Sequence, residues 1–72
     1  MSDNDMVLRF MREFGYITQK EAVRTLNCYR LSARIHDLRR RGHNIITERV
    51  PFHKGDHWST YARYWLKEEQ DG

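Results

Sequence analysis

The 72-residue chain has little cysteine and little proline, with one residue of each, Cys28 and Pro51. A single cysteine excludes an intramolecular disulfide and a cysteine-rich zinc site, and we expect Cys28 to be a small buried residue. The chain also lacks the run of about 18 apolar residues that a membrane span requires. Residues 1–5 are acidic where a signal peptide would be basic, so a cytoplasmic protein is expected.

Length and composition predict one small domain. Hydrophobic residues make up 39% of the chain and aromatic residues 12%, which is enough for a modest core but not for two domains. We expect residues 1–72 to form a single domain, with an ordered core at about residues 4–67 and short acidic ends. Because no cross-link is available, its stability must come from packing.

The charge is unevenly distributed along the chain. The formal net charge is only +3, yet residues 6–67 carry 13 basic and 5 acidic side chains, a balance of +8. A basic body with acidic ends is typical of a nucleic-acid-binding protein. The alternative is a soluble surface that happens to be rich in arginine.

Helical spacing of apolar residues predicts three helices. The first spans about residues 4–14 and stops at Gly15. The second opens at a capping box, in which the Thr18 hydroxyl accepts from the Glu21 amide and Glu21 reaches back to the Thr18 amide. Asn27 is suited both to end this helix and to cap the next one at once, which gives a third helix at about residues 28–41.

The third helix and the segment after it indicate the fold class. Leu31, Ile35 and Leu38 lie on one face of the third helix and are predicted to be buried. After Gly42, β-branched and aromatic residues predict two antiparallel strands, 45–50 and 61–66, joined by a long tip at 51–58. Three helices followed by a hairpin predict a mainly α fold with a small β hairpin (α+β), in the order of a winged helix-turn-helix.

The segments 15–22, 30–50 and 61–66 resemble small helix-turn-helix proteins that are widespread in bacteriophages and prophages. The similarity covers most of residues 6–66. It implies a DNA-binding domain whose third helix contacts double-stranded DNA. The sequence departs from this family in the wing, where His53, His57 and Trp58 replace the expected small and basic residues.

The side of the third helix opposite its buried face is the predicted DNA-reading surface, because the N-terminal part of a recognition helix reaches base edges. Arginine can bind guanine in a bidentate manner, alanine can contact a thymine methyl group, and aspartate can accept from cytosine. The predicted base-reading residues are Tyr29, Arg30, Ala33, Arg34 and Asp37. The predicted phosphate contacts, which position the protein without reading sequence, are Arg39, Arg40, Arg41, Arg49, Lys54 and Arg63. The alternative for the run 39–41 is a solvated last turn that compensates the helix dipole.

Alternation along the second strand predicts that Trp65 faces outward, and exposed tryptophan is enriched at protein interfaces. An exposed Trp65 or Trp58 would mark the surface of a homodimer or of another protein partner. It would also support an alternative function: a phage-type interaction protein that binds and inhibits or redirects a host or phage protein. The four histidines lack the spacing of metal ligands, and no catalytic constellation is present in the sequence. We expect no metal, no cofactor and no enzymatic activity.

Overall fold

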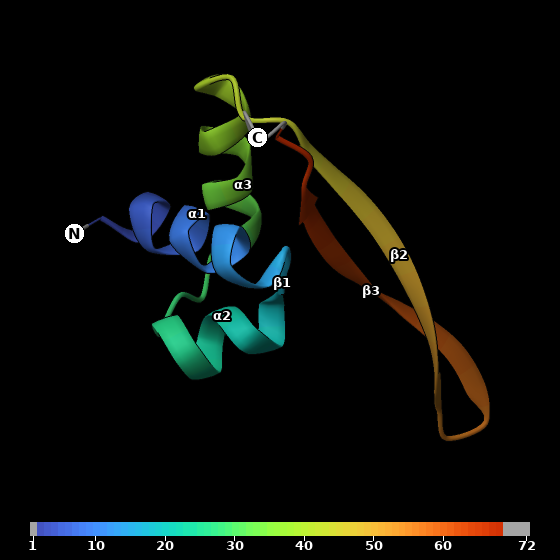
Figure 1. The fold of residues 1–72 in the computed structure, drawn as a ribbon. Helices are drawn as coiled ribbons and strands as arrows, with labels where there is room; N and C mark the ends of the chain where they lie inside the picture. The colour runs from blue at the N-terminus through green and yellow to red at the C-terminus, as the bar shows by residue number, and fades with distance from the viewer. Residues whose placement is uncertain (1, 69–72) are drawn as a thin grey trace.

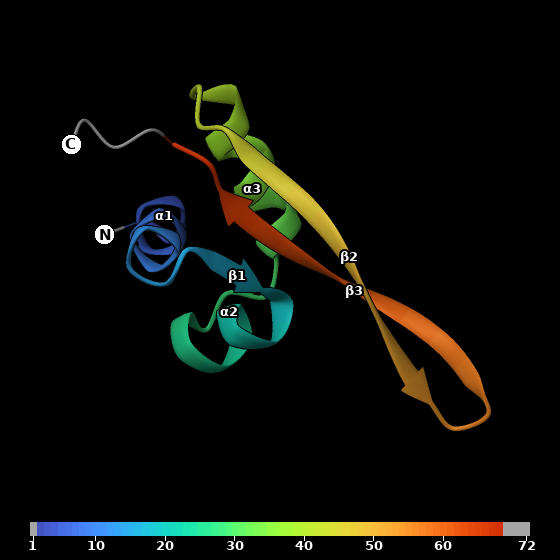
Figure 2. The same cartoon turned by 45° about the vertical axis from the view of Figure 1, so that its right-hand side comes forward.

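A computed structural model describes residues 2–68 of the chain (Figure 1). The elements, in chain order, are α1 (Asp3–Phe14), β1 (Tyr16–Thr18), α2 (Gln19–Leu26), α3 (Leu31–Arg40), β2 (Ile45–Lys54) and β3 (His57–Leu66). Three helices together with an antiparallel hairpin confirm the predicted winged helix-turn-helix architecture. The helices form one body, from which the hairpin extends to one side (Figures 1 and 2).

The hairpin belongs to a three-stranded antiparallel sheet with the order β1-β3-β2. Strand β1 was not predicted. It is only three residues long, and it pairs with the end of β3 through Ile17 and Tyr64. Ile17 is fully buried. This short strand therefore fixes the base of the hairpin to the helical body.

The predicted long tip at residues 51–58 is wrong. The ladder runs without interruption from Ile45 paired with Leu66 to Lys54 paired with His57, and the turn consists of Gly55 and Asp56. Pro51 is tolerated within β2 because β2 is an edge strand, where a missing N–H can face away from the partner strand. The result is a long, narrow wing with a tight turn.

The boundary between α2 and α3 differs from the prediction. Asn27 does end α2, in the left-handed conformation with φ of +54°. It does not cap α3, because the next amide, that of Cys28, still donates to the carbonyl of Ala22 in α2. Helix α3 therefore begins at Leu31, with Arg30 as its N-cap residue and no side-chain capping bond.

One of the two hydrogen bonds predicted for the capping box at the start of α2 is present. The Thr18 hydroxyl accepts from the Glu21 amide at 3.4 Å. The Glu21 carboxylate does not return to the Thr18 amide; it accepts from the Thr18 hydroxyl at 2.7 Å. Thr18 is already part of β1 and pairs with Arg63 of β3, so its backbone belongs to the sheet.

The hydrophobic core lies where the three helices meet the base of the sheet. Leu31, Ile35 and Leu38 are each at most 1% exposed, which confirms the predicted buried face of α3. The buried hydrophobic residues are Val7, Met11, Ile17, Ala22, Cys28, Leu31, Ile35, Leu38 and Ile45. Because one side of α3 is committed to this core, its other side is available to solvent.

Beyond the core, a polar contact connects the end of β3 to the helices. The Glu68 carboxylate is hydrogen-bonded to the ring of His43 and lies 3.4 Å from the Arg12 guanidinium. The hydrogen bond to His43 is the main reason why the pKa of Glu68 is lowered, and Arg12 adds to the effect. A lowered carboxyl pKa stabilises the fold above the pKa of the unfolded chain, and this contribution is lost as the pH falls through the folded pKa.

We therefore expect Glu68→Gln to lower the free energy of unfolding at pH 7 by about 0.2–1 kcal/mol, the range of partly exposed ion pairs. The difference from wild type should shrink as the pH is lowered from 7 to about 3, because the folded carboxyl becomes progressively protonated and the ion pair is lost. Urea unfolding at both pH values tests this. A difference of equal size at the two pH values would contradict the ion-pair interpretation.

Candidate nucleic-acid interface

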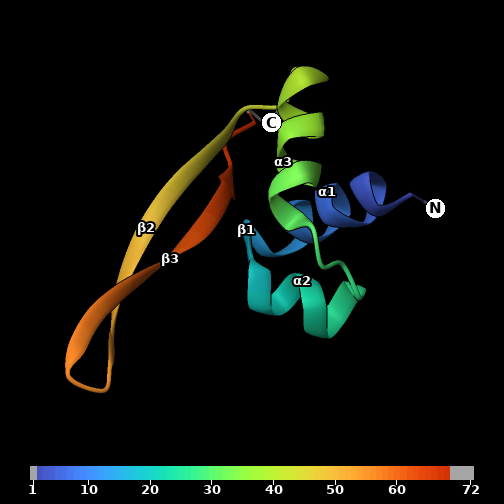
Figure 3. The same cartoon turned by 180° about the vertical axis from the view of Figure 1, so that it is seen from behind.

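The exposed side of α3 is a polar surface on the outside of the helical body, and Figure 3 shows this helix in front with the wing beside it. Ser32, His36 and Arg40 are exposed and follow one another at intervals of four residues. This places them along one side of the helix, opposite its buried face. An α-helix with such a face has the width to enter a DNA major groove.

Tyr29 and Arg30 lie before α3 rather than in its first turn, which corrects the predicted helix start at residue 28. Both are exposed, and 68% of Tyr29 is accessible to solvent. The carbonyl of Tyr29 accepts from Gln19 Nε2 at 3.0 Å, so the first residue of α2 holds this turn. Their side chains thus flank the N-terminal end of α3.

The other predicted base-reading residues are less exposed. Ala33 is half-buried, and Arg34 forms an ion pair with Asp37 at 3.2 Å. Asp37 also accepts from Asn4 Nδ2 of α1 at 3.4 Å. Asp37 is therefore in a position to orient Arg34, whose side chain is 31% exposed.

Three predicted phosphate contacts are exposed and uncommitted. Arg40 lies on α3, Arg49 lies on β2, and Lys54 lies at the end of β2 beside the hairpin turn. Within residues 2–68 none of the three forms an ion pair or a side-chain hydrogen bond. Cations without a competing carboxylate are the ones best able to bind phosphate.

The other three residues that were predicted to bind phosphate interact with groups of the protein itself; they are Arg39, Arg41 and Arg63. Arg39 donates to the Ile45 carbonyl at 2.8 and 3.1 Å and to the Thr47 hydroxyl at 2.9 Å. The Arg41 guanidinium is 4.0 Å from the Asp5 carboxylate, at the limit of an ion pair. Arg39 therefore ties the end of α3 to the start of β2.

The alternation of β2 shows which side of the hairpin adjoins α3. Thr47, which accepts from Arg39 of α3, pairs with Tyr64, and Arg49 pairs with Ala62. Residues two apart in a strand lie on the same face. Arg49 thus shares the face of the hairpin that continues from α3, whereas Arg63, which pairs with Glu48, lies on the other face.

The comparisons with known proteins agree with this geometry. The sequence model of the winged helix-turn-helix domain family matches residues 2–69. The chain belongs to the winged helix-turn-helix domain family. No curated protein and no solved structure matches it. The winged helix-turn-helix is typically a DNA-binding fold without catalytic activity, so the family supports a DNA-binding role with DNA as the partner.

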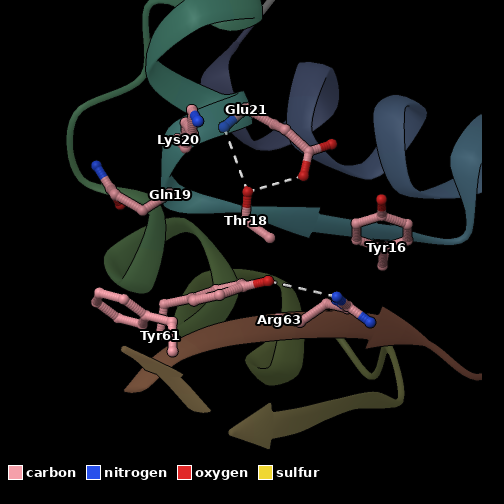
Figure 4. Close-up of a pocket in the computed structure, with 8 residues that line it drawn as sticks. Tyr16, Thr18, Gln19, Lys20, Glu21, Tyr61 and Arg63 are labelled. Carbon is pink, nitrogen blue, oxygen red and sulfur yellow. Dashed lines mark hydrogen bonds between the residues drawn. The ribbon is translucent and has the colours of Figure 1, made fainter. Parts of the chain in front are cut away.

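The face of the sheet on which Arg63 lies, opposite the face that continues from α3, is called the far face below. It carries a groove of about 700 Å³ between the wing and the start of α2. Figure 4 shows it; its lining residues are Tyr16, Thr18, Gln19, Lys20, Glu21, Phe52, Tyr61 and Arg63. This groove could not be predicted from the sequence, because part of its wall is β1, which is too short to show alternation.

Arg63 lies in this groove and is held by its neighbours. Its guanidinium donates to Glu48 at 3.3 Å and to the Tyr61 hydroxyl at 3.4 Å, and it lies 5.1 Å from the Tyr16 ring centre. The hydrogen bond to Tyr61 is the main cause of its raised pKa. The charge of Arg63 is thus engaged by Glu48 and Tyr61 on the far face of the sheet, and Arg63 is not part of the exposed side of α3.

The two tryptophans have different environments. Trp58, beside the turn of the wing, is 70% exposed and has an edge-on contact with His53, with ring centres 5.1 Å apart. Trp65 is only partly exposed, packs on Tyr16 and donates its indole N–H to Glu48 at 2.9 Å. Of the two tryptophans predicted as candidate interface residues, Trp58 is the exposed one.

Residues 2–68 contain neither a cluster of metal-ligating side chains nor a membrane-spanning helix. In this range no three His, Cys, Asp or Glu side chains gather closely enough to hold a metal ion. In the same range no helix combines the length and the apolar character needed to cross a bilayer.

Proposed function

We propose that this protein binds double-stranded DNA by placing α3 in the major groove and the wing against the backbone, and that it acts as a small phage-type transcriptional regulator or as an architectural or excision factor. One observation carries the proposal. The exposed side of α3 adjoins, through Arg39 and Thr47, the face of the wing that holds Arg49. Basic side chains from two elements can therefore meet one duplex together.

Base reading is proposed for the N-terminal end of α3. Arg30 is exposed and has no acidic partner among residues 2–68, so its guanidinium can make a bidentate contact with guanine. Tyr29 flanks it, and Ala33 allows close approach. Arg34 and Asp37 act as a pair, in which the carboxylate orients the guanidinium.

Phosphate binding is proposed mainly for Arg40, Arg49 and Lys54, because their charges are uncommitted within residues 2–68. Arg41 can join them, since its distance to Asp5 is at the limit of an ion pair. Arg39 has a mainly positioning role, because its donors hold β2 against α3.

Fluorescence anisotropy with a random labelled duplex tests the function. Roughly four phosphate contacts should give a slope of about −4 in a plot of log K against log salt. A folded protein that fails to bind duplex at low salt would overturn the proposed function. Binding that does not change with salt would contradict the phosphate contacts.

A second candidate is a phage-type interaction protein that binds and inhibits or redirects a host or phage protein. The exposure of Trp58 on the wing favours it. Trp65 adds little, because its indole is already bonded to Glu48. Loss of capture of a protein partner by Trp58→Ala, with no duplex binding by the wild type, would favour this candidate over DNA binding.

A further inference from the structure

Helix α1 carries an apolar surface that the fold does not cover. The rings of Phe10 and Phe14 pack with their centres 4.6 Å apart, and Phe14 is 57% exposed. They border a groove of about 320 Å³ between α1 and α2, which Thr25 and Leu26 close on the α2 side. Large exposed aromatic side chains beside a groove are typical of an interface.

The same groove has one basic and one acidic residue on the α1 side. Arg9 and Glu13 both border it, and within residues 2–68 neither forms an ion pair. Other charged residues of α1 do have partners: Arg12 pairs with Glu68, and Asp5 approaches Arg41. The two charges at the groove are therefore available to a partner that offers the opposite signs in the reverse order.

We propose that the partner is a second copy of this chain, with α1 packed antiparallel on α1 around a two-fold axis near Phe10. An interface with two-fold symmetry requires a self-complementary patch. In this arrangement Met6 of one copy faces Phe14 of the other. Arg9 then lies opposite Glu13 of the other copy, with an offset of about two residues, or roughly 3 Å along the helix, which a long arginine side chain can span.

The proposed dimer is separate from the DNA-binding surface. The residues that border the groove lie on α1 and α2, and none of them lies on α3. Helix α1 lies in front of α3 in Figure 1 and behind it in Figure 3. Val7 and Met11 of α1 are buried in the core, whereas Phe10 and Phe14 border the groove. Self-association through α1 would thus leave α3 and the wing open.

Sedimentation equilibrium of the full chain without DNA tests the proposal. The wild type should associate reversibly to a dimer between about 10 µM and 1 mM, as expected of a small interface. Arg9→Glu and Glu13→Arg should each weaken the dimer more than about tenfold, because symmetry creates two like-charge contacts. The double variant, with the two charges exchanged, should restore association.

Arg24→Glu is the matched control, since it makes the same charge change on α2 outside the groove and should leave the dimer unchanged. Phe14→Ser should abolish association while circular dichroism shows an intact fold, because the ring is largely exposed. A wild type that stays monomeric over the whole concentration range overturns the proposal. The proposal is then wrong even if another protein binds in the groove. A folded double variant that fails to recover association also overturns it.

Discussion

Replacing Leu38 with alanine is expected to lower the free energy of unfolding by about 2–5 kcal/mol, through lost transfer energy and the cavity left behind. Leu38 is fully buried in the last turn of α3 and belongs to the hydrophobic core. The loss is comparable to the whole stability of a domain of this size, so the variant should be largely unfolded. Thermal and urea unfolding followed by circular dichroism measure it.

Ser32→Ala is the control for this substitution. It lies on the exposed side of the same helix, and a surface change there should alter the free energy of unfolding by no more than about 0.5 kcal/mol. Equal stabilities of the two variants would mean that the faces of α3 are assigned the wrong way round. The DNA-binding surface would then have to be placed elsewhere.

The second large effect distinguishes base reading from phosphate binding. Arg30→Ala should weaken binding to a selected target by about 1–3 kcal/mol and weaken binding to random duplex less, because it removes a base contact. Arg40→Ala should weaken binding to both duplexes about equally and make the salt slope shallower by roughly one. Titrations of both variants on both duplexes at one fixed salt concentration make the comparison.

The target is obtained by enriching random duplexes on the purified wild-type protein. Arg63→Ala serves as a control on the far face of the sheet, where its contacts are with Glu48 and Tyr61. It should affect DNA affinity less than Arg40→Ala does. If enrichment gives no consensus and Arg30 and Arg40 variants behave alike, the protein is an architectural binder without sequence preference.

The elements that the sequence predicted are those with a long apolar period. Helix α1 matches the prediction to within one residue, because its apolar spacing and Gly15 mark both its body and its end. The buried face of α3 could be predicted for the same reason. The start of α3 could not, since Asn27 has a side chain suited to two roles and the bond from Cys28 to Ala22 selects only one of them.

The remaining differences arise from contacts between distant segments. A three-residue strand such as β1 shows no period, and only its pairing with β3 defines it. The length of the wing could not be predicted from the sequence of residues 51–58, because Pro51 and the histidines in this segment are typical of a loop. The roles of Arg39 and Arg63 depend on Ile45, Glu48 and Tyr61, which are positioned by the fold.

The support of the hairpin ends well before its turn. Strand β1 pairs with β3 only from Arg63 to Trp65, so from Ala62 to the turn the wing has, among residues 2–68, no third strand. This free length contributes to a shape that measures 45 Å along its longest axis. Amide protection should therefore decline from the base of the wing toward Gly55. The proposed contact of the wing with DNA can therefore adapt to a curved duplex, because the two strands can twist while α3 keeps its position.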